Sequence, residues 1–283
     1  MRGLTLEGGG MRGLYSEGIF DIFLEKGIDF SVLVGVSAGA LLGVNYISKQ
    51  PERGLRYNSE YMNDKRYSGL KFLITTGNLF NTEFAYYELP TKLDVFDNEE
   101  YKKSDKRLWS EAIDIETGEA VFTRIDDVFA QMEYLRASGS LPFISKPVEV
   151  DGRKCLDGGM AESIPIDYTF KLGCDKVVVI LTRQAGYEKK PEGRMMKLFT
   201  KIKYRKYPKL AEALLTRSSR YNSYLKEIEK MEKEGKIFVF RPSVPIEIDR
   251  LEKSPEKLRE VYELGKKDGL AGLDKMLEYL NAE

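Results

Sequence analysis

One serine lies between two glycines at the end of an apolar run, a setting that is typical of a catalytic nucleophile. Residues Gly35-Val36-Ser37-Ala38-Gly39 fit the pattern G-x-S-x-G, in which a strand turns sharply into a helix and exposes the serine oxygen. The glycines leave room for that turn and tolerate strained backbone angles. Short matches to this pattern also arise by chance, so the apolar run before it and the helix-like run after it carry the interpretation.

The absence of histidine narrows the chemistry open to Ser37. None of the 283 residues is a histidine, so a Ser-His-Asp triad is impossible and another side chain must act as the base. Asp157 is a candidate, because it follows a short strand-like run and precedes Gly158-Gly159. A carboxylate at a strand end can reach a neighbouring loop. Taken alone, Asp157 is also an ordinary turn residue, since Asp-Gly is a frequent turn dipeptide.

The composition also narrows the choice of metals and cofactors. Histidine-ligated metal sites are excluded, and Cys155 and Cys174 are too few for a cysteine-rich zinc site. We interpret both cysteines as small buried apolar residues and not as a disulfide framework. No clustered acidic loop of the EF-hand type is present. We therefore expect no metal and no cofactor.

A glycine-rich loop follows the first predicted strand. Gly8-Gly9-Gly10-Met11-Arg12-Gly13 also satisfies G-x-G-x-x-G, the dinucleotide-binding pattern. That function needs an acidic residue at the end of the second strand, and Asp29 lies before this strand instead, so we disfavour it. The alternative is an oxyanion hole, in which successive glycine amides stabilise a negatively charged oxygen. Arg12 either has a role at this loop, bracing it or meeting an anionic head group, or forms a surface ion pair, and the sequence leaves both open.

The order of predicted elements is that of an α/β protein. Strands are predicted at residues 3–7, 31–34, 108–115, 120–123, 148–150, 153–156, 176–182 and 236–241. Helices are predicted at residues 14–26, 38–48, 52–61, 128–137, 164–172, 221–234 and 255–279, the last as one or two helices. Asp126 or Asp127 is expected to cap the helix that begins at 128. The unbroken apolar run within 176–182 predicts a buried parallel strand.

Two further segments have an unusual composition. Residues 62 to about 101 contain no regular pattern but many aromatic side chains, which either line an apolar pocket or pack within an inserted subdomain. Residues 189–209 hold nine Lys or Arg against the single Glu192, interleaved with apolar side chains. This basic segment is either a membrane-surface contact, through about residues 194–209, or a solvated face balanced by the acidic C-terminal region.

The overall charge and hydropathy limit the class of partner. The 45 basic and 45 acidic residues cancel, which argues against a dedicated nucleic-acid binder. No apolar run approaches the ~18 residues of a membrane span, and the N-terminus lacks the apolar core of a signal peptide. We therefore expect a cytoplasmic protein, with peripheral contact at the inner membrane surface if the basic segment binds lipid.

Three segments together resemble the patatin-like phospholipase family, in its bacterial branch. They are Gly8–Gly13, Gly35–Gly39 and Asp157-Gly158-Gly159, whose order and spacing match those of the family. Ala137–Pro142 and Ile164–Ile166 also resemble bacterial members. The resemblance covers about residues 2 to 185. It implies a three-layer α/β/α fold with a mostly parallel central sheet and a Ser-Asp dyad without histidine.

The resemblance also implies roles and a domain organisation. Ser37 would be the nucleophile and Asp157 the general base, and the amides of Gly8, Gly9, Gly10 and Met11, supported by Arg12 and Ala38, would form the oxyanion hole. The implied catalytic domain spans residues 1–185, with an aromatic-rich insert at about 62–107. Residues 186–283 would form the basic segment and a mostly helical extension on the same domain.

The resemblance implies a hydrolase of lipid esters, of the phospholipase A or lysophospholipase type. Two alternatives remain: a catalytically silent lipid-binding or regulatory protein on the same fold, and a soluble esterase or thioesterase with no membrane contact. The sequence does not specify the head group, the acyl length, the position of the ester or the oligomeric state.

Overall fold

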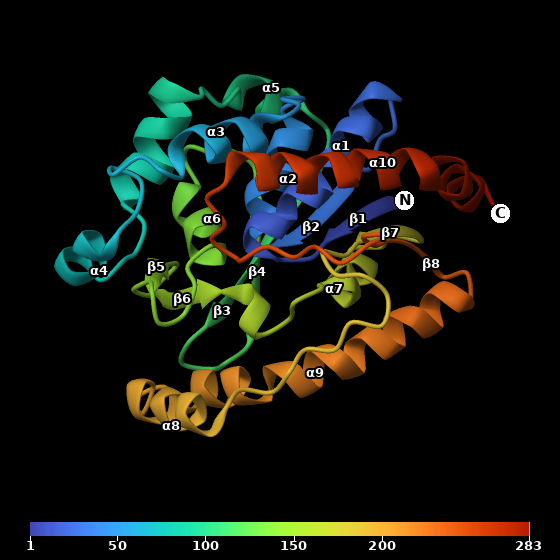
Figure 1. Cartoon of the computed structure of the whole chain (residues 1–283). Helices are drawn as coiled ribbons and strands as arrows, with labels where there is room; N and C mark the ends of the chain where they lie inside the picture. The colour runs from blue at the N-terminus through green and yellow to red at the C-terminus, as the bar shows by residue number, and fades with distance from the viewer. Residues whose placement is uncertain (283) are drawn as a thin grey trace.

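An eight-stranded sheet forms the centre of the protein in the computed structural model, which describes residues 1–282 (Figure 1). Its strands are β1 (Arg2–Leu6), β2 (Val32–Val36), β3 (Arg107–Asp114), β4 (Ala120–Ile125), β5 (Val148–Val150), β6 (Arg153–Asp157), β7 (Lys176–Ile180) and β8 (Ile237–Phe240). The strands β3-β2-β1-β7-β8 are neighbours in this order and parallel. The remaining three join as antiparallel strands. The predicted, mostly parallel sheet is therefore confirmed.

Strand β3 pairs with two different strands along one of its edges. Val36 at the end of β2 pairs with Glu111, and Asp157 at the end of β6 pairs with Ala112, the next residue along β3. Strand β4 pairs with residues 108–113 and occupies the opposite edge. The ends of β2 and β6 therefore meet on the same edge of β3.

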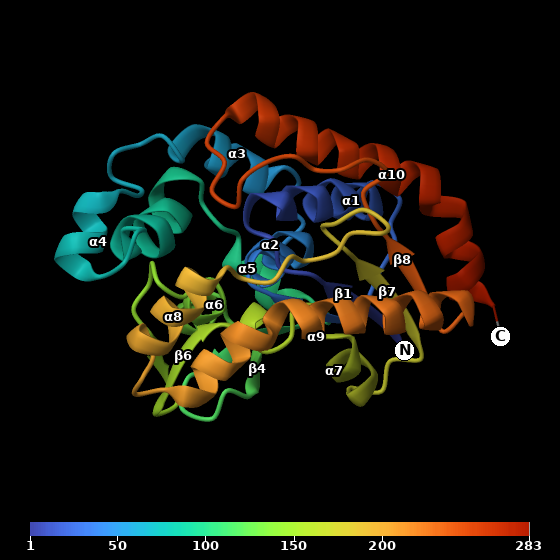
Figure 2. The ribbon, with the colours of Figure 1, turned by 60° about the horizontal axis from the view of Figure 1, so that its bottom comes forward.

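Helices cover both faces of the sheet (Figures 1 and 2). The α-helices are α1 (Leu14–Glu25), α2 (Ala38–Ile47), α3 (Arg53–Tyr61), α4 (Leu70–Thr76), α5 (Asn98–Lys103), α6 (Met132–Ser138), α7 (Ile166–Lys171), α8 (Arg194–Lys203), α9 (Pro208–Lys233) and α10 (Pro255–Asn281). Two short 3-10 helices, η1 (Gly10–Gly13) and η3 (Gly158–Met160), and a π-helix, η2 (Glu83–Leu93), complete the set. In Figure 1, α1, α2, α3 and α10 lie on one side of the sheet and α7 and α9 on the other.

The alternation of side chains along β7 shows why both faces carry helices. Val178 and Ile180 belong to the core cluster that contains residues of α1, α2 and α10. Val177 and Val179 point the other way, into a cluster with Tyr221 of α9. Successive side chains of a strand point to opposite faces, so an unbroken apolar strand requires cover on both sides. The predicted α/β/α arrangement is confirmed.

The aromatic segment differs from the prediction. The segment from residue 62 to about 101, predicted to have no regular pattern, contains α4, the π-helix η2 and most of α5, joined by turns. Pro90 lies inside η2, and proline removes an amide donor and breaks the regular helical pattern. These elements are short and pack through mixed aromatic contacts, such as Tyr67 edge-on against Phe84, so no 3.6-residue periodicity marks them in the sequence.

Some helix boundaries also differ. The helix predicted at 128–137 begins only at Met132, because residues 126–131 form a turn in which Asp127 Oδ1 accepts a hydrogen bond from the amide of Ala130. The helix predicted at 164–172 is shorter, Ile166–Lys171, and the helix predicted at 221–234 is the second half of α9. The final segment forms one helix, α10. None of the helices in residues 1–282 combines the length and the apolarity that crossing a membrane requires.

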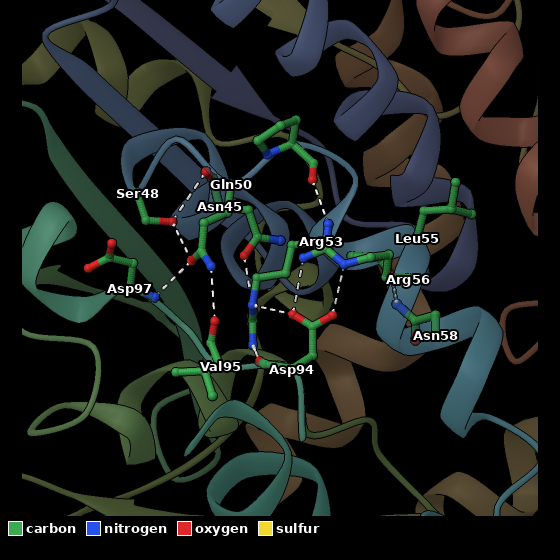
Figure 3. Close-up of polar contacts among 12 residues, drawn as sticks. Asn45, Ser48, Gln50, Arg53, Leu55, Arg56, Asn58, Asp94, Val95 and Asp97 are labelled. Carbon is green, nitrogen blue, oxygen red and sulfur yellow. Dashed lines mark hydrogen bonds and ion pairs between the residues drawn. The ribbon is translucent and has the colours of Figure 1, made fainter. Parts of the chain in front are cut away.

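A buried ion pair ties the aromatic segment to the helical layer (Figure 3). Arg53 at the start of α3 is 4% exposed, and its Nε lies 3.1 Å from Asp94 Oδ1, just after η2. Its other nitrogens donate to Asn45 of α2 and to the carbonyl oxygen of Asp94. The guanidinium also stacks over the rings of Tyr57 and Phe96. This network fixes the aromatic segment beside the cavity described below.

Candidate active site

Ser37 lies at the sharp turn between β2 and α2, as predicted. Its φ of 54° and ψ of −125° lie in a backbone region that residues other than glycine rarely adopt. Its amide donates to Ser138 Oγ over 2.8 Å, at the end of α6. A Cβ on Gly8 would lie 3.0 Å from the Cβ of Ser37, so only glycine lets the loop after β1 come this close. The turn is thus held in its strained shape by neighbours from two other segments.

Asp157 meets Ser37 directly. The hydroxyl of Ser37 donates to Asp157 Oδ2 over 2.6 Å, and the amide of Gly159 donates to Asp157 Oδ1 over 2.8 Å. The amide of Asp157 itself donates to the carbonyl oxygen of Ser140 over 2.8 Å. Both interpretations of Asp157 therefore apply. Its Oδ1 accepts from the Gly159 amide, as in a turn, and its Oδ2 accepts from the hydroxyl of Ser37.

Burial changes the acidity of this carboxyl group. Asp157 is 1% exposed, and desolvation raises its pKa above the ordinary value for aspartate. The hydrogen bond from Ser37 and the positive charge of Arg217 oppose this rise, because both favour the ionised form. A carboxylate with a raised pKa is a stronger proton acceptor than an exposed one.

The glycine loop faces Ser37 as expected, but its amides are not equivalent. In residues 1–282 the amides of Gly8, Gly9, Gly10 and Ala38 donate no hydrogen bond to another residue. The amide of Met11, in contrast, donates to the carbonyl oxygen of Arg250 over 3.0 Å. Met11 was predicted as an oxyanion donor, and this contact removes its amide from that set. No pattern in the sequence predicts this contact, because Arg250 lies in a loop far along the chain.

Arg12 is not in a surface ion pair. Its side chain is 6% exposed, and Arg12 Nε has no hydrogen-bond partner within residues 1–282. Burial and, second, the nearby charge of Arg183 lower the pKa of Arg12 to about 10, against the opposing charge of Glu7. A buried, incompletely paired guanidinium that lines a cavity is suited to an anion.

Ser37, Asp157 and the glycine loop all line one cavity of about 510 Å³. Its apolar part comes from α2, α6 and the aromatic segment. Among the aromatic residues of that segment, those that line the cavity are Tyr67, Phe80, Tyr86 and Phe96. Phe72, Phe84 and Tyr87 do not. Some aromatic side chains of the segment therefore line the apolar pocket, and the others pack within the segment.

Several residues that the sequence analysis did not single out support the site. Glu7, at the end of β1, accepts hydrogen bonds from the amide and hydroxyl of Thr182 and from the hydroxyl of Tyr221. Arg217 of α9 donates to the carbonyl oxygen of Gly159 over 2.6 Å. No local pattern marks these residues, because each contact joins segments more than fifty residues apart. Within residues 1–282 no group of three or more metal-ligating side chains is present.

Comparison with known families agrees with this geometry. The sequence profile described as "Patatin-like phospholipase" matches residues 4–170, which is more than half of the chain. The chain therefore belongs to the patatin-like phospholipase family, and its class is that of the lipid ester hydrolases. A second profile, a domain of unknown function (DUF6363), matches residues 207–281.

Individual relatives are distant. The uncharacterized protein YjjU of Escherichia coli is 26% identical over 97% of this chain and 78% of its own length. The probable lipid hydrolase 463L of Invertebrate iridescent virus 6 is 28% identical over 59% of this chain and 63% of its own length. The chain covers 10% of the lysophospholipase NTE1 of Saccharomyces cerevisiae, at 26% identity. The crystal structure of VipD from Legionella pneumophila aligns with a TM-score of 0.47 and 12% identity, over 97% of this chain and 67% of that one.

Proposed function

We propose that this protein is a serine acyl hydrolase that cleaves carboxylic esters of lipids with a Ser37–Asp157 dyad. The observation that carries the proposal is the 2.6 Å hydrogen bond from the Ser37 hydroxyl to a buried aspartate in a protein without histidine. A nucleophile that hydrogen-bonds to its base is the arrangement that acyl transfer requires. The strained turn supports the assignment, since such strain is concentrated at functional sites.

The first half of the reaction forms an acyl-enzyme. Ser37 Oγ attacks the ester carbonyl carbon while Asp157 Oδ2 accepts the hydroxyl proton. The negative charge on the carbonyl oxygen is stabilised by the amides of Gly9, Gly10 and Ala38, which have no other partner in residues 1–282. One such donor is typically worth ~3 kcal/mol in the transition state. Collapse of the tetrahedral intermediate breaks the bond to the leaving alcohol, which takes the proton from Asp157.

The second half of the reaction releases the acyl group. A water molecule attacks the acyl carbon of the Ser37 ester, and Asp157 accepts its proton. The second tetrahedral intermediate collapses, the fatty acid leaves, and Ser37 Oγ regains a proton from Asp157. The Gly159 amide keeps the other carboxylate oxygen occupied, so Oδ2 stays directed at Ser37 throughout.

The lipid nature of the substrate rests on the cavity and the relatives. The apolar walls from α2, α6 and the aromatic segment can bury an acyl chain. Several relatives carry the names lysophospholipase or lipid hydrolase. We therefore propose a phospholipid or lysophospholipid ester as the substrate class.

Helix α8 is the part of the chain that we propose contacts a membrane surface. Its apolar side chains are exposed, including Met195 at 87% and Leu198 at 60%. Lys197 and Lys201 alternate with the exposed apolar residues along the same helix. Exposed apolar residues interleaved with lysines favour peripheral binding to an anionic lipid surface.

The test of the catalytic proposal is hydrolysis of a short-chain p-nitrophenyl ester by the wild type, Ser37→Ala and Asp157→Asn. We expect both variants to lose at least 1000-fold in kcat/KM, about 4 kcal/mol of transition-state stabilisation, while circular dichroism shows the wild-type fold. An Asp157→Asn protein with full activity would refute the dyad.

The rival function is a lipid-binding protein that does not turn over its ligand. A fluorophosphonate probe separates the two, because it reacts only with an activated serine. Labelling of the wild type, with no labelling of Ser37→Ala, supports the enzyme. Failure to label the wild type, together with binding of lysophospholipid, would favour the silent binder.

A further inference from the structure

Seven cationic side chains line the cavity that contains Ser37. Arg53 is paired with Asp94, and Lys190 is exposed next to Lys189, so five remain as candidates for a shared site. Arg12 comes from η1, Arg217 from α9 and Arg250 from the loop before α10, and all line the cavity. Arg183 and Lys189, in the segment after β7, line it too. Three of the five lie beyond residue 185, so they are far from the motifs that define the catalytic site.

None of these cations has a carboxylate partner. In residues 1–282 no carboxylate oxygen lies within 4.0 Å of the charged nitrogens of Arg12, Arg183, Lys189, Arg217 or Arg250. The buried carboxylates nearby are engaged elsewhere. Glu7 accepts from Thr182 and Tyr221, and Asp157 from Ser37 and Gly159. Glu188 and Glu192 line the cavity but are exposed at its rim.

The cations lie close enough to repel one another. Burial, and then the charge of Arg217, lower the pKa of Lys189 to about 7. Arg250 and Arg12 contribute to the same effect. The pKa of Arg217 is lowered by burial and by Arg250. The charges of Glu7 and, at Arg217, of Asp157 oppose this lowering but do not outweigh it. Like charges held together in excess cost free energy that a bound anion would recover.

We propose that these side chains form a subsite for the phosphate group of an acyl ester substrate, with Lys189, Arg217 and Arg250 as its specificity-determining residues. This inference rests on the proposed function and adds the substrate class: a lipid whose head group is a phosphate monoester. Arg12 lines the same cavity from the glycine loop, and its buried Nε has no hydrogen-bond partner among residues 1–282. Guanidinium groups match the geometry of phosphate oxygens.

The arrangement favours a phosphate monoester over a zwitterionic head group. A monoester carries nearly two negative charges near neutral pH, which suits a cluster of four arginines and a lysine, Lys189, that a bound anion would keep protonated. A choline head group would add a quaternary ammonium to a space that already holds arginine and lysine side chains. The two aromatic faces among these cations are already covered, since Lys189 Nζ lies 3.9 Å from the ring centre of Tyr221 and Arg183 lies 4.4 Å from that of Tyr187.

Binding to the Ser37→Ala protein tests the subsite without turnover. The ligands are oleoyl lysophosphatidic acid, oleoyl lysophosphatidylcholine and monooleoylglycerol, which share one acyl chain, measured by isothermal titration calorimetry below their critical micelle concentrations. We expect lysophosphatidic acid to bind at least tenfold more tightly than either of the others. Equal affinities would overturn the proposal. Inorganic phosphate is titrated alone, and affinity for it equal to that for lysophosphatidic acid would identify a free-anion site instead.

Variants then assign the preference to the named residues. Lys189→Gln and Arg250→Gln should each reduce the ratio of lysophosphatidic acid to monooleoylglycerol affinity about tenfold. Lys226→Gln, an exposed lysine on α9 outside the cavity, should leave the wild-type ratio. Arg250 is itself exposed, so its variant is expected to fold even if Lys189→Gln does not. An unchanged ratio in Arg250→Gln and Lys189→Gln would overturn the assignment.

The same experiments separate this proposal from the catalytic one. If the wild type does not hydrolyse esters but Ser37→Ala binds lysophosphatidic acid selectively, the hydrolase is refuted and the phosphate subsite stands. Hydrolysis by the wild type without any preference for the phosphate monoester would do the reverse.

Discussion

The hydrogen bond between Ser37 and Asp157 is set by the register of β3. Val36, just before Ser37, pairs with Glu111, and Asp157 pairs with Ala112, the next residue of the same strand. The two catalytic candidates are 120 residues apart in the chain, yet their separation of 2.6 Å follows from two adjacent positions on one strand. Because strand pairing fixes backbone positions, this arrangement holds both groups in place before substrate arrives.

The first prediction concerns the pH dependence of hydrolysis. Asp157 accepts a proton only when ionised, and burial raises its pKa, so kcat/KM should fall with decreasing pH at a higher pH than an ordinary aspartate would give. Arg217 lowers this pKa by its charge. Arg217→Gln should therefore move the acid limb of the profile to still higher pH. The measurement is kcat/KM for a neutral ester as a function of pH.

Lys226→Gln, which removes an exposed charge from the same helix, is the control for that profile. Its acid limb should coincide with that of the wild type. A shift of the Arg217→Gln limb toward lower pH would contradict the electrostatic role of Arg217.

The second prediction concerns the glycine loop. Gly10 has a φ of +60°, and a Cβ there would lie 2.5 Å from the carbonyl oxygen of Arg250, which accepts from the Met11 amide. Gly10→Ala should therefore displace the loop and reduce kcat by at least 100-fold, since an oxyanion donor is worth ~3 kcal/mol. KM should change much less, because the apolar walls from α2, α6 and the aromatic segment are untouched.

Gly27→Ala is the matched control for backbone strain. Gly27 has a φ of +63°, and nothing lies within 4 Å of its added Cβ. This variant should lose about 1 kcal/mol of stability from the left-handed conformation alone and keep its kcat. Equal losses of kcat in both variants would show that strain, and not the loop's position, is responsible.

The third prediction concerns the ion pair that holds the aromatic segment. Arg53→Ala leaves Asp94 without its buried partner and removes the stacking over Tyr57 and Phe96. Asp94 keeps its pair with the half-exposed Arg56, so the free energy of unfolding should fall by about 2 kcal/mol, the usual worth of hydrogen bonds to a charged group. Chemical denaturation measures it. Arg259→Ala, which breaks an exposed pair with Glu263, should cost less than ~1 kcal/mol.

If Arg53→Ala were as stable as Arg259→Ala, the network would not anchor the segment. Because Arg53 and Phe96 also line the cavity, we expect the loosened variant to raise KM for long-chain esters more than for short-chain ones.

The fourth prediction concerns α8. Leu198→Ser/Ile202→Ser removes two exposed apolar side chains, and Lys197→Glu/Lys201→Glu reverses two charges of the same helix. Each pair should reduce co-sedimentation with phosphatidylglycerol vesicles at least tenfold, and only the charge reversal should lose its effect in high salt. Lys226→Glu/Lys233→Glu on α9 is the control. Wild-type binding by both α8 variants would exclude this helix as the contact.

The sequence alone determined the elements whose signals are local. The Ser37 turn was predictable because strand, glycine, serine and helix are consecutive. The lack of histidine required another base for Ser37, for which Asp157 was a candidate. The apolar run of β7 predicted a buried parallel strand, which β7 is. These conclusions depend on neighbouring residues, on residue types and on composition, which need no knowledge of the fold.

The contacts between residues far apart in the sequence were decided only by the tertiary structure. Only the register of β3 brings Asp157 to Ser37, and only the placement of Arg250 against the glycine loop takes the Met11 amide out of the expected oxyanion hole. The unpaired cations beside Ser37 come from η1, α9 and two loops, and their spacing in the sequence carries no sign that they converge. Such contacts follow from the packing of whole layers against the sheet, which no local pattern encodes.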